Sequence, residues 1–302
     1  MKKYKLNLNN NKLENRKSKK QKKIKNEKIK SKKDYRFAIL STMSSGKSTL
    51  INALLGKDIL PSENQACTGK IFEISNFKIK KETIQALKNE EIIFNKIDSK
   101  VLKELNNNNE VDKIKVKAKF YAIDKEIVLY DTPGINNYMN KSHEKVTYDF
   151  LEKNEIKNII YILNATQIGV NDDKKFLLDL KEFYKNKKVN IIFLLNKIDT
   201  IDLENEDKEI IIKNTKEYLK NIGYKSLVII PTSAQIAKIL RKGINNNLET
   251  RREKMEFKNH VNLYLEKNNL LNNQKVIINR KLIEKMIYET GIKDLEKIIS
   301  EI

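Results

Sequence analysis

The chain has 302 residues, 39% of them hydrophobic, which is enough for one large α/β domain or two small ones. Its formal net charge is +21. Eight glycines, three prolines and no tryptophan argue against a β-sandwich and for long helices between strands. A single cysteine, Cys67, excludes an internal disulfide, and no run approaches the ~18 apolar residues of a membrane span. We therefore expect a soluble, cytoplasmic protein without a transmembrane segment.

Residues 1–33 form a basic segment. They contain 15 Lys or Arg and two Glu, a net charge of +13, which leaves 21 − 13 = +8 for the other 269 residues. Their scattered Leu and Ile follow no sustained period, so we expect a disordered or induced-helix arm. Such an arm suits the phosphates of RNA or the headgroups of an anionic membrane, to which the protein would bind peripherally. Composition leaves both partners open.

The first predicted strand and helix flank a phosphate-loop motif that lacks one of its usual glycines. An apolar run at 36–40 predicts a strand, and the helical spacing of 49–55 predicts a helix that Gly56 stops. Between them lies Ser41-Thr-Met-Ser-Ser-Gly-Lys-Ser48, which differs from G-x-x-x-x-G-K-[ST] at its first residue. In this motif Lys47 reaches the β and γ phosphates and Ser48 ligates Mg²⁺. The tripeptide Gly-Lys-Ser is weak evidence alone in a lysine-rich chain, so its weight depends on the motifs later in the chain.

The middle of the chain contains a loop and further strands. Residues 57–69 form a loop with one isolated threonine, Thr68, and 70–75 form a strand. We expect a helical or irregular excursion over 82–110. Apolar residues alternate with lysines at 113–120, which predicts a strand with one wet face. The nearly continuous apolar run 126–130 predicts a buried strand that leads directly into Asp131-Thr-Pro-Gly134.

The second half alternates strands with helices. Strands are expected at 156–163, 189–195 and 226–230, and helices at 172–186 and 206–221. Residues 235–275 have a helical pattern, and 276–300 an amphipathic helix or helix pair interrupted near Gly291. This alternation predicts an α/β fold with a mostly parallel central sheet and helices on both faces.

Four short motifs follow strands in a fixed order. The phosphate loop, Asp131-Thr-Pro-Gly134, Asn196-Lys-Ile-Asp199 and Pro231-Thr-Ser-Ala234 each come at the carboxyl end of their own strand, where α/β sheets bind ligands. The Asp199 carboxylate can accept hydrogen bonds from guanine N1–H and the 2-amino group, which adenine does not offer in that geometry. The sequence therefore predicts GTP. A second Asn-Lys-Ile-Asp, at 95–98, precedes Asp131 and follows no buried strand, so we assign it no role.

These residues support a family resemblance. Ser44-Ser-Gly-Lys-Ser-Thr-Leu-Ile-Asn-Ala-Leu-Leu-Gly56, then Ile59-Leu-Pro61 and Thr68, resembles the GTPase domain of the dynamin family, especially the bacterial dynamin-like proteins. The resemblance implies a P-loop GTPase fold over 34–302, with a helical insertion near 235–275. It also implies slow hydrolysis of GTP to GDP with Mg²⁺, stimulated by a homodimer across the nucleotide face. Because the chain ends at Ile302, no dynamin stalk is expected in it.

The resemblance also implies a role for each motif residue. Ser44 would position the attacking water and a charge-compensating group, Thr68 would orient that water, and the Gly134 N–H would sense the γ-phosphate. Mg²⁺ would be held by Ser48, Thr68 and Asp131, the last through water. The implied nucleotide-binding residues are Ser45, Gly46, Lys47, Ser48, Thr49, Asn196, Lys197, Asp199, Ser233 and Ala234. Two departures from the family are Ser41 and Met43, which stand where a glycine and, in eukaryotic dynamins, a glutamine are expected.

The alternative is an Era-like GTPase that binds RNA or the ribosome through the basic arm. Era-like enzymes share Gly-Lys-Ser-Thr-Leu and Asp-Thr-Pro-Gly with this chain. The 62 residues between Thr68 and Asp131 resemble the enlarged dynamin-type sheet and are too many for the compact Era-like hairpin. The arm also has only one aromatic residue, Tyr4, and so offers no platform for stacking bases.

Overall fold

The structure is a computed structural model that describes residues 35–61, 70–77, 79, 81–88, 91–95, 111, 113–134, 141–201, 207–270 and 278–302. The basic arm at 1–33, Cys67 and the predicted switch residue Thr68 lie outside these ranges. Within them, no helix combines the length and the apolar character that crossing a membrane requires.

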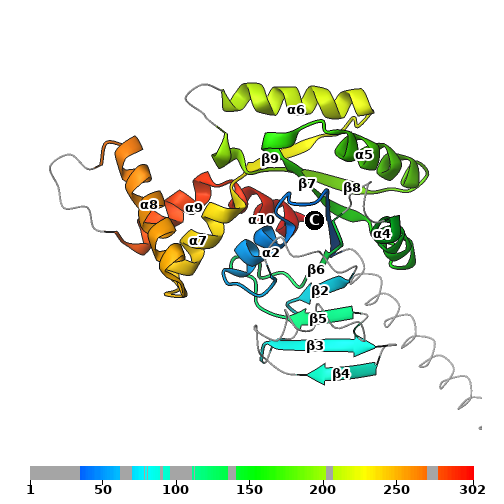
Figure 1. Ribbon diagram of the computed structural model, residues 1–302, viewed down its shortest axis with the longest axis horizontal. Coiled ribbons are helices and arrows are strands. Elements are labelled where there is room, and N and C mark those ends of the chain that lie inside the picture. Colours follow the sequence, from blue (N-terminus) through cyan, green and yellow to red (C-terminus); the bar gives the residue numbers. More distant parts are fainter. Residues whose placement is uncertain are drawn as a thin grey trace, which may run out of the picture.

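One nine-stranded sheet runs through the described part of the chain, in the order β4-β3-β5-β2-β6-β1-β7-β8-β9 (Figure 1). The strands are β1 Arg36–Ser41, β2 Ile71–Ser75, β3 Thr83–Lys88, β4 Glu91–Asn95, β5 Lys113–Lys117, β6 Val128–Asp131, β7 Asn158–Asn164, β8 Asn190–Asn196 and β9 Val228–Thr232. The pairs β1–β6, β1–β7, β2–β5, β7–β8 and β8–β9 are parallel, while β2–β6, β3–β4 and β3–β5 are antiparallel. The predicted mostly parallel sheet is confirmed.

Helices cover both faces of this sheet, as predicted. They are α2 Lys47–Leu55, α4 Lys141–Lys153, α5 Asn171–Phe183, α6 Lys208–Ile222, α7 Ala234–Ile244, α8 Arg251–Lys267, α9 Arg280–Glu289 and α10 Ile292–Glu301, with short 3₁₀ turns η1 Ala165–Gln167 and η2 Ile198–Thr200. Figure 1 shows α4, α5 and α6 on one side of the sheet and α2 with α7 to α10 on the other.

Strand β1 illustrates how the sequence builds two cores. Successive side chains of a strand point to opposite faces, so Phe37 and Ile39 join the core under α2, whereas Ala38 and Leu40 join the core under α4 and α5. All four are completely buried. A strand buried on both faces lies in the middle of the sheet, which places the phosphate loop that follows it near the centre of the molecule.

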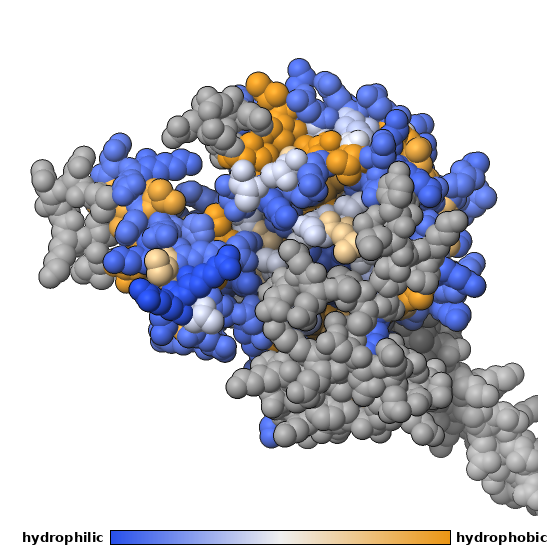
Figure 2. Space-filling model, viewed as in Figure 1, coloured by the Kyte–Doolittle hydropathy of each residue, from blue (hydrophilic) through white to orange (hydrophobic). Residues whose placement is uncertain are grey.

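The C-terminal helices belong to the same core as α2, the helix that follows the phosphate loop. Leu240 of α7, Val261 of α8, Ile287 of α9 and Leu295 of α10 are buried in one cluster with Leu54 of α2. On the face that Figure 2 shows, mostly hydrophilic residues lie over α7 and α8, with scattered hydrophobic ones. The predicted interruption of the last helical segment is confirmed, because Gly291 separates α9 from α10 with φ 75°.

The expected helical or irregular excursion over 82–110 is wrong in its first part. Residues 83–88 and 91–95 form β3 and β4, which pair with each other and extend the sheet beyond β5. Gln, Ala, Leu and Lys favour helices locally, but Ile84 and Ala86 alternate onto the buried face of the sheet once β5 supplies an edge. Residues 96–110 lie outside the described ranges.

Candidate functional site

The phosphate loop connects β1 to α2 and closes on itself. Ser44 and Gly46 adopt left-handed backbone conformations, with φ 59° and 96°, and Gly46 is the N-cap of α2. The Lys47 Nζ donates to Ser41 Oγ over 3.0 Å, so the serine that replaces the expected glycine holds the lysine across the loop. Because a helix N-terminus presents unpaired N–H groups and positive potential, the loop is built to receive an anion.

A buried carboxylate faces the start of α2. Asp131 is the last residue of β6, and its Oδ2 accepts a 3.3 Å hydrogen bond from Ser48 Oγ. Burial raises the pKa of Asp131 to about 6, against the opposing effects of the Lys47 charge and the Ser48 hydrogen bond. The other oxygen, Oδ1, is buried and has no hydrogen-bond partner among the described residues. A buried acceptor without a partner is costly, so this oxygen is available to a group that donates to it.

Gly134 brings the second motif against the first. A Cβ at Gly134 would lie 3.1 Å from Lys47 Nζ and 3.2 Å from the Met43 side chain. Thr132, in the same motif, donates from Oγ1 to the Ile39 carbonyl of β1 over 2.8 Å. The Asp-Thr-Pro-Gly segment therefore packs directly on the phosphate loop, and a side chain at Gly134 would require Lys47 and Met43 to shift by a few tenths of an ångström.

Asn196 joins three motifs through its side chain. Its Nδ2 donates to the Ser45 carbonyl in the phosphate loop over 2.8 Å, and its Oδ1 accepts from the Ala234 N–H at the start of α7 over 3.1 Å. A Cβ at Gly46 would lie 2.5 Å from the same Nδ2, so the loop needs glycine there to let Asn196 approach. The parallel register places Asn196 beside Thr232, which is why the ends of β8 and β9 meet at one rim.

The remaining predicted base-binding residues lie just beyond β8 and β9. Lys197 turns the chain with a left-handed φ of 64°, and Asp199 lies exposed in the 3₁₀ turn that follows. Ser233 is buried as the N-cap of α7, and its N–H donates to the Thr290 carbonyl over 3.0 Å. By contrast, Asn95 of the second Asn-Lys-Ile-Asp ends β4, at the opposite edge of the sheet from β8 and β9.

The structure thus brings most of the predicted residues to one rim. Those described there are Ser44, Ser45, Gly46, Lys47, Ser48, Thr49, Asp131, Gly134, Asn196, Lys197, Asp199, Ser233 and Ala234. Sequence reasoning missed Ser41 as the partner of Lys47, and it missed the contact between Thr290 and Ser233. No sequence signal marked the second, because it joins segments 57 residues apart.

Comparison with known proteins assigns the chain to a family. A model of the Dynamin family matches residues 37–198, more than half of the chain. The chain belongs to the dynamin family. An uncharacterized protein in the xynA 3′ region of Caldicellulosiruptor sp. strain Rt8B.4 is 30% identical over 211 residues, covering 68% of this chain and 50% of that protein. The bacterial dynamin-like protein of Nostoc punctiforme is 25% identical over 181 residues, covering 55% of this chain and 25% of that protein.

The fold of this dynamin-family chain also has a solved counterpart. A structure described as an oligomerised bacterial dynamin pair, with a mechanism for the long-range sensing and tethering of membranes, matches with a TM-score of 0.54 at 21% identity. The match covers 88% of this chain and 42% of that one. The chain spans half or less of the length of these relatives.

Proposed function

We propose that this chain binds GTP with Mg²⁺ and hydrolyses it to GDP and phosphate, and that self-association raises the rate. The single observation that carries the proposal is the pair of hydrogen bonds made by Asn196, to Ser45 in the phosphate loop and to Ala234 beside Ser233. One side chain thereby holds together the loop suited to phosphates and the two turns suited to a base. The dynamin-family match over residues 37–198 supports the same function.

Asp199 supports guanine as the base. It is exposed in the turn after β8, next to Lys197, so its carboxylate is accessible to a ligand. Guanine presents two donors, N1–H and the 2-amino group, to one carboxylate, whereas adenine presents an acceptor at N1. A site built on hydrogen bonds discriminates strongly, because the wrong base leaves polar groups unpaired.

Residues of the phosphate loop and β6 fit Mg²⁺. A magnesium ion bound with a nucleotide keeps several waters and takes only one or two protein oxygens. The Ser48 hydroxyl and the unpartnered Oδ1 of buried Asp131 match this requirement, the second as an acceptor for a metal-bound water. We propose Ser48, Thr68 and Asp131 as the residues that hold the ion. When bound, Mg²⁺ neutralises charge on the β and γ phosphates.

The chain's own residues would position the phosphates and the water. Lys47 supplies the loop's cation, and the Gly134 N–H is proposed to contact the γ-phosphate beside it. Ser44 is exposed at the tip of the loop in a left-handed conformation, a strained geometry that recurs at functional sites. We propose that Ser44 and Thr68 orient the attacking water, because Ile135 follows Gly134 where Ras-like enzymes carry glutamine.

The test is GTP binding and turnover by the whole chain. We expect GTP to bind more tightly than ATP in the presence of Mg²⁺, and phosphate to be released slowly. Lys47→Ala should abolish binding, because the loop loses its side-chain cation. Lys57→Ala is the matched control, since Lys57 pairs with Glu82 away from the loop. Wild-type affinity in Lys47→Ala would overturn the proposed function.

A further inference from the structure

The Lys47 ammonium group lies between the two motifs of the rim that are suited to phosphates. Its Nζ donates to Ser41 Oγ over 3.0 Å, and both side chains are buried. On the other side, a Cβ at Gly134 would lie 3.1 Å from the same Nζ. The lysine therefore extends back across the loop to its first residue and ends beside the Asp-Thr-Pro-Gly segment.

The direction of the Ser41 hydroxyl is fixed by the loop itself. Ser41 Oγ donates its one hydrogen to the Thr42 carbonyl oxygen over 2.7 Å. Lone pairs alone remain on this oxygen, so it acts toward Lys47 as an acceptor. A glycine, which the motif has at this place, would offer the ammonium group no side-chain acceptor.

The Thr42 carbonyl also connects Ser41 with the rest of the rim. This oxygen accepts a second hydrogen bond, from Ser45 Oγ over 3.0 Å, so hydroxyl groups from both ends of the loop meet on it. The Ser45 carbonyl in turn accepts from Asn196 Nδ2 over 2.8 Å. A connected network thus runs across the loop from Lys47 to Asn196 at the end of β8.

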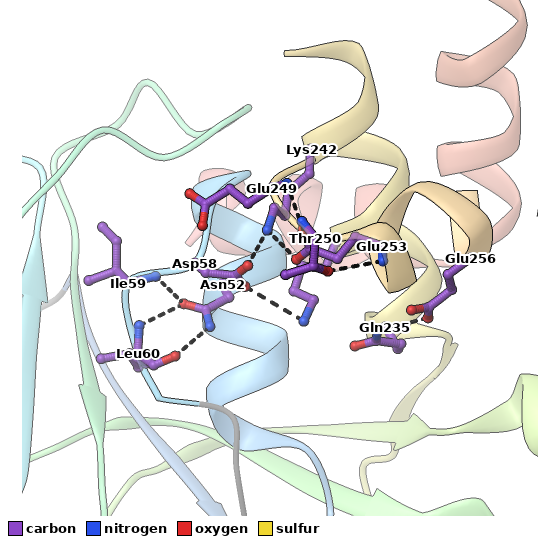
Figure 3. Close-up of polar contacts among 11 residues, drawn as sticks. Asn52, Asp58, Ile59, Leu60, Gln235, Lys242, Glu249, Thr250, Glu253 and Glu256 are labelled. Atoms are coloured by element: carbon purple, nitrogen blue, oxygen red, sulfur yellow. Dashed lines mark hydrogen bonds and ion pairs between the residues drawn. The ribbon is translucent and has the colours of Figure 1, made fainter. Parts of the chain in front are cut away.

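The backbone of Lys47 is held in place because α2 is anchored. The completely buried Asn52 of this helix donates from Nδ2 to the Leu60 carbonyl over 2.7 Å. Its Oδ1 accepts from the N–H groups of Ile59 and Leu60 at 3.0 and 2.9 Å. Figure 3 shows Asn52 pointing from α2 toward these two residues. The three bonds fasten α2, whose first residue is Lys47, to the chain that follows it.

Helix α7 holds the last turn of α2. The completely buried Arg241 donates from Nη1 to the Ala53 carbonyl over 2.7 Å. Its neighbour Lys242 contacts Asp58 and Glu253, which attaches the residues after α2 to α7 and α8 (Figure 3). With the helix held in this way, the position of the Lys47 ammonium group depends on its side chain, whose four-carbon stem is flexible.

We propose that Ser41 is a positioning residue for Lys47, whose ammonium group it holds where the β and γ phosphates of GTP bind. The inference rests on the proposed function and deepens it. An ammonium group carries three N–H donors, so the bond to Ser41 is compatible with contacts to phosphate oxygens. A side chain that is already ordered loses less conformational freedom when the ligand binds. Ser41 therefore contributes to affinity without touching the nucleotide.

The proposal predicts a loss of affinity that depends on the phosphates of the ligand. The lysine of this motif reaches the β and γ phosphates, of which GDP has the first and GMP has neither. Ser41→Ala should therefore weaken the binding of GTP and GDP about tenfold and leave the affinity for GMP within about twofold. A general disturbance of the site would weaken all three ligands, because they share the base.

The experiment measures the affinities of GTP, GDP and GMP for the whole chain in the presence of Mg²⁺. Ser41→Ala and Ser41→Gly both remove the hydroxyl, and the second restores the glycine of the motif. Thr215→Val is the matched control, because it removes a completely buried hydroxyl that donates to the Ile211 carbonyl of α6, on the side of the sheet opposite α2 (Figure 1). Asp199→Asn checks that the GMP measurement responds, since it should weaken GTP and GMP by the same factor.

We expect both Ser41 variants to lose affinity for GTP and GDP alone, and Thr215→Val to bind all three ligands as the wild type does. Wild-type GTP affinity in Ser41→Ala and Ser41→Gly would overturn the positioning role. So would an equal loss of GMP affinity, or tighter GTP binding, which would mean that Ser41 competes with the phosphates for Lys47. If wild-type protein binds GTP and Lys47→Ala does not, these results leave the proposed function standing. Absence of GTP binding by the wild type overturns both.

Discussion

Among single residues, Asp199 separates recognition of the base from binding of the phosphates. Replacing its carboxylate by an amide in Asp199→Asn presents a donor where guanine needs an acceptor, and xanthine, with a carbonyl at that place, supplies the match. We expect the variant to prefer xanthosine triphosphate to GTP, measured by competition binding. The matched control is Asp98→Asn in the second Asn-Lys-Ile-Asp, which should keep the wild-type preference. If Asp98→Asn changes the preference and Asp199→Asn does not, the base is read elsewhere.

Thr68 and Ser44 separate hydrolysis from binding. Thr68→Ala should leave GTP affinity within a few-fold, because other residues make the ground-state contacts, and should lower turnover by ~10² or more. Ser44→Ala should behave alike if the site uses dynamin-type chemistry. Single-turnover hydrolysis of prebound GTP measures both effects. A wild-type rate in Thr68→Ala would exclude its proposed role, and a wild-type rate in Ser44→Ala alone would leave a GTPase with different chemistry.

At the level of elements, a buried carboxylate joins α5 to its neighbours. Asp173 accepts hydrogen bonds from Tyr161 of β7 at 2.6 Å and Tyr218 of α6 at 3.3 Å. Burial raises the pKa of Asp173 to about 6, although both tyrosines act to lower it. Because the folded state binds this proton more tightly than the unfolded state, the contribution to stability is full below pH 3.8 and is lost as pH rises through about 6.

Asp173→Asn should therefore change stability in a pH-dependent way. The wild type gains about 1 kcal/mol from this group between pH 8 and pH 5, and the variant cannot gain it because the amide does not titrate. Denaturant unfolding at the two pH values measures the difference. The same pH dependence in both proteins would show that Asp173 does not titrate in this range. Asp172→Asn, at the adjacent half-buried position, should show the wild-type dependence.

The junction between α9 and α10 depends on the absence of a side chain. Gly291 has φ 75°, and a Cβ there would lie 2.0 Å from the Pro231 carbonyl oxygen of β9. Gly291→Ala should destabilise the fold by about 3 kcal/mol or more, through backbone strain and the clash together. Gly169→Ala is the control, because its φ of 79° is similar but its Cβ would meet Tyr218 only at 3.6 Å.

Gly169→Ala should lower the free energy of unfolding by only about 1 kcal/mol, because it adds the backbone strain without the clash. Urea unfolding of both variants gives the comparison. Equal losses would mean that the Pro231 contact relaxes and that the α9–α10 junction does not hold the rim residues Ser233 and Thr290 in place.

For the whole molecule, the proposed dimer across the nucleotide face predicts that turnover depends on concentration. If association supplies part of the positioning, the rate per molecule should rise with protein concentration until the dimer is saturated. Steady-state phosphate release, measured over a hundredfold range of protein concentration, would show this directly. A constant rate per molecule would exclude stimulation by self-association.

The basic arm at 1–33 leads to a prediction that an anionic membrane surface raises turnover. The arm's +13 charge suits anionic lipid, so we expect vesicles containing phosphatidylserine to raise turnover more than neutral vesicles do. Deleting residues 1–33 should remove the effect, and high salt should weaken it. Stimulation by RNA instead, with none by anionic vesicles, would identify the arm as an RNA-binding element.

Much of this architecture could be predicted from short-range patterns. The strands that carry the motifs are apolar runs, and their order along the chain fixes which turns share the carboxyl edge of a parallel sheet. The motif residues, the helix after the phosphate loop and the break at Gly291 follow from local spacing and backbone preference. Their roles toward GTP, and the role of Thr68, stay predictions.

Contacts between distant segments were decided only by tertiary structure. Strands β3 and β4 form because β5 offers an edge to pair with, although their own residue types do not indicate strands. Asn196 could be placed at the rim from its motif, but its bonds to Ser45 and Ala234 required the strands to be paired in register. The cluster of Lys242, Asp58 and Glu253 left no trace in a lysine-rich sequence. An exposed charged side chain is satisfied by water, so its residue type does not indicate a protein partner. A buried one needs a protein partner, and which side chains are buried is decided only by the assembled fold.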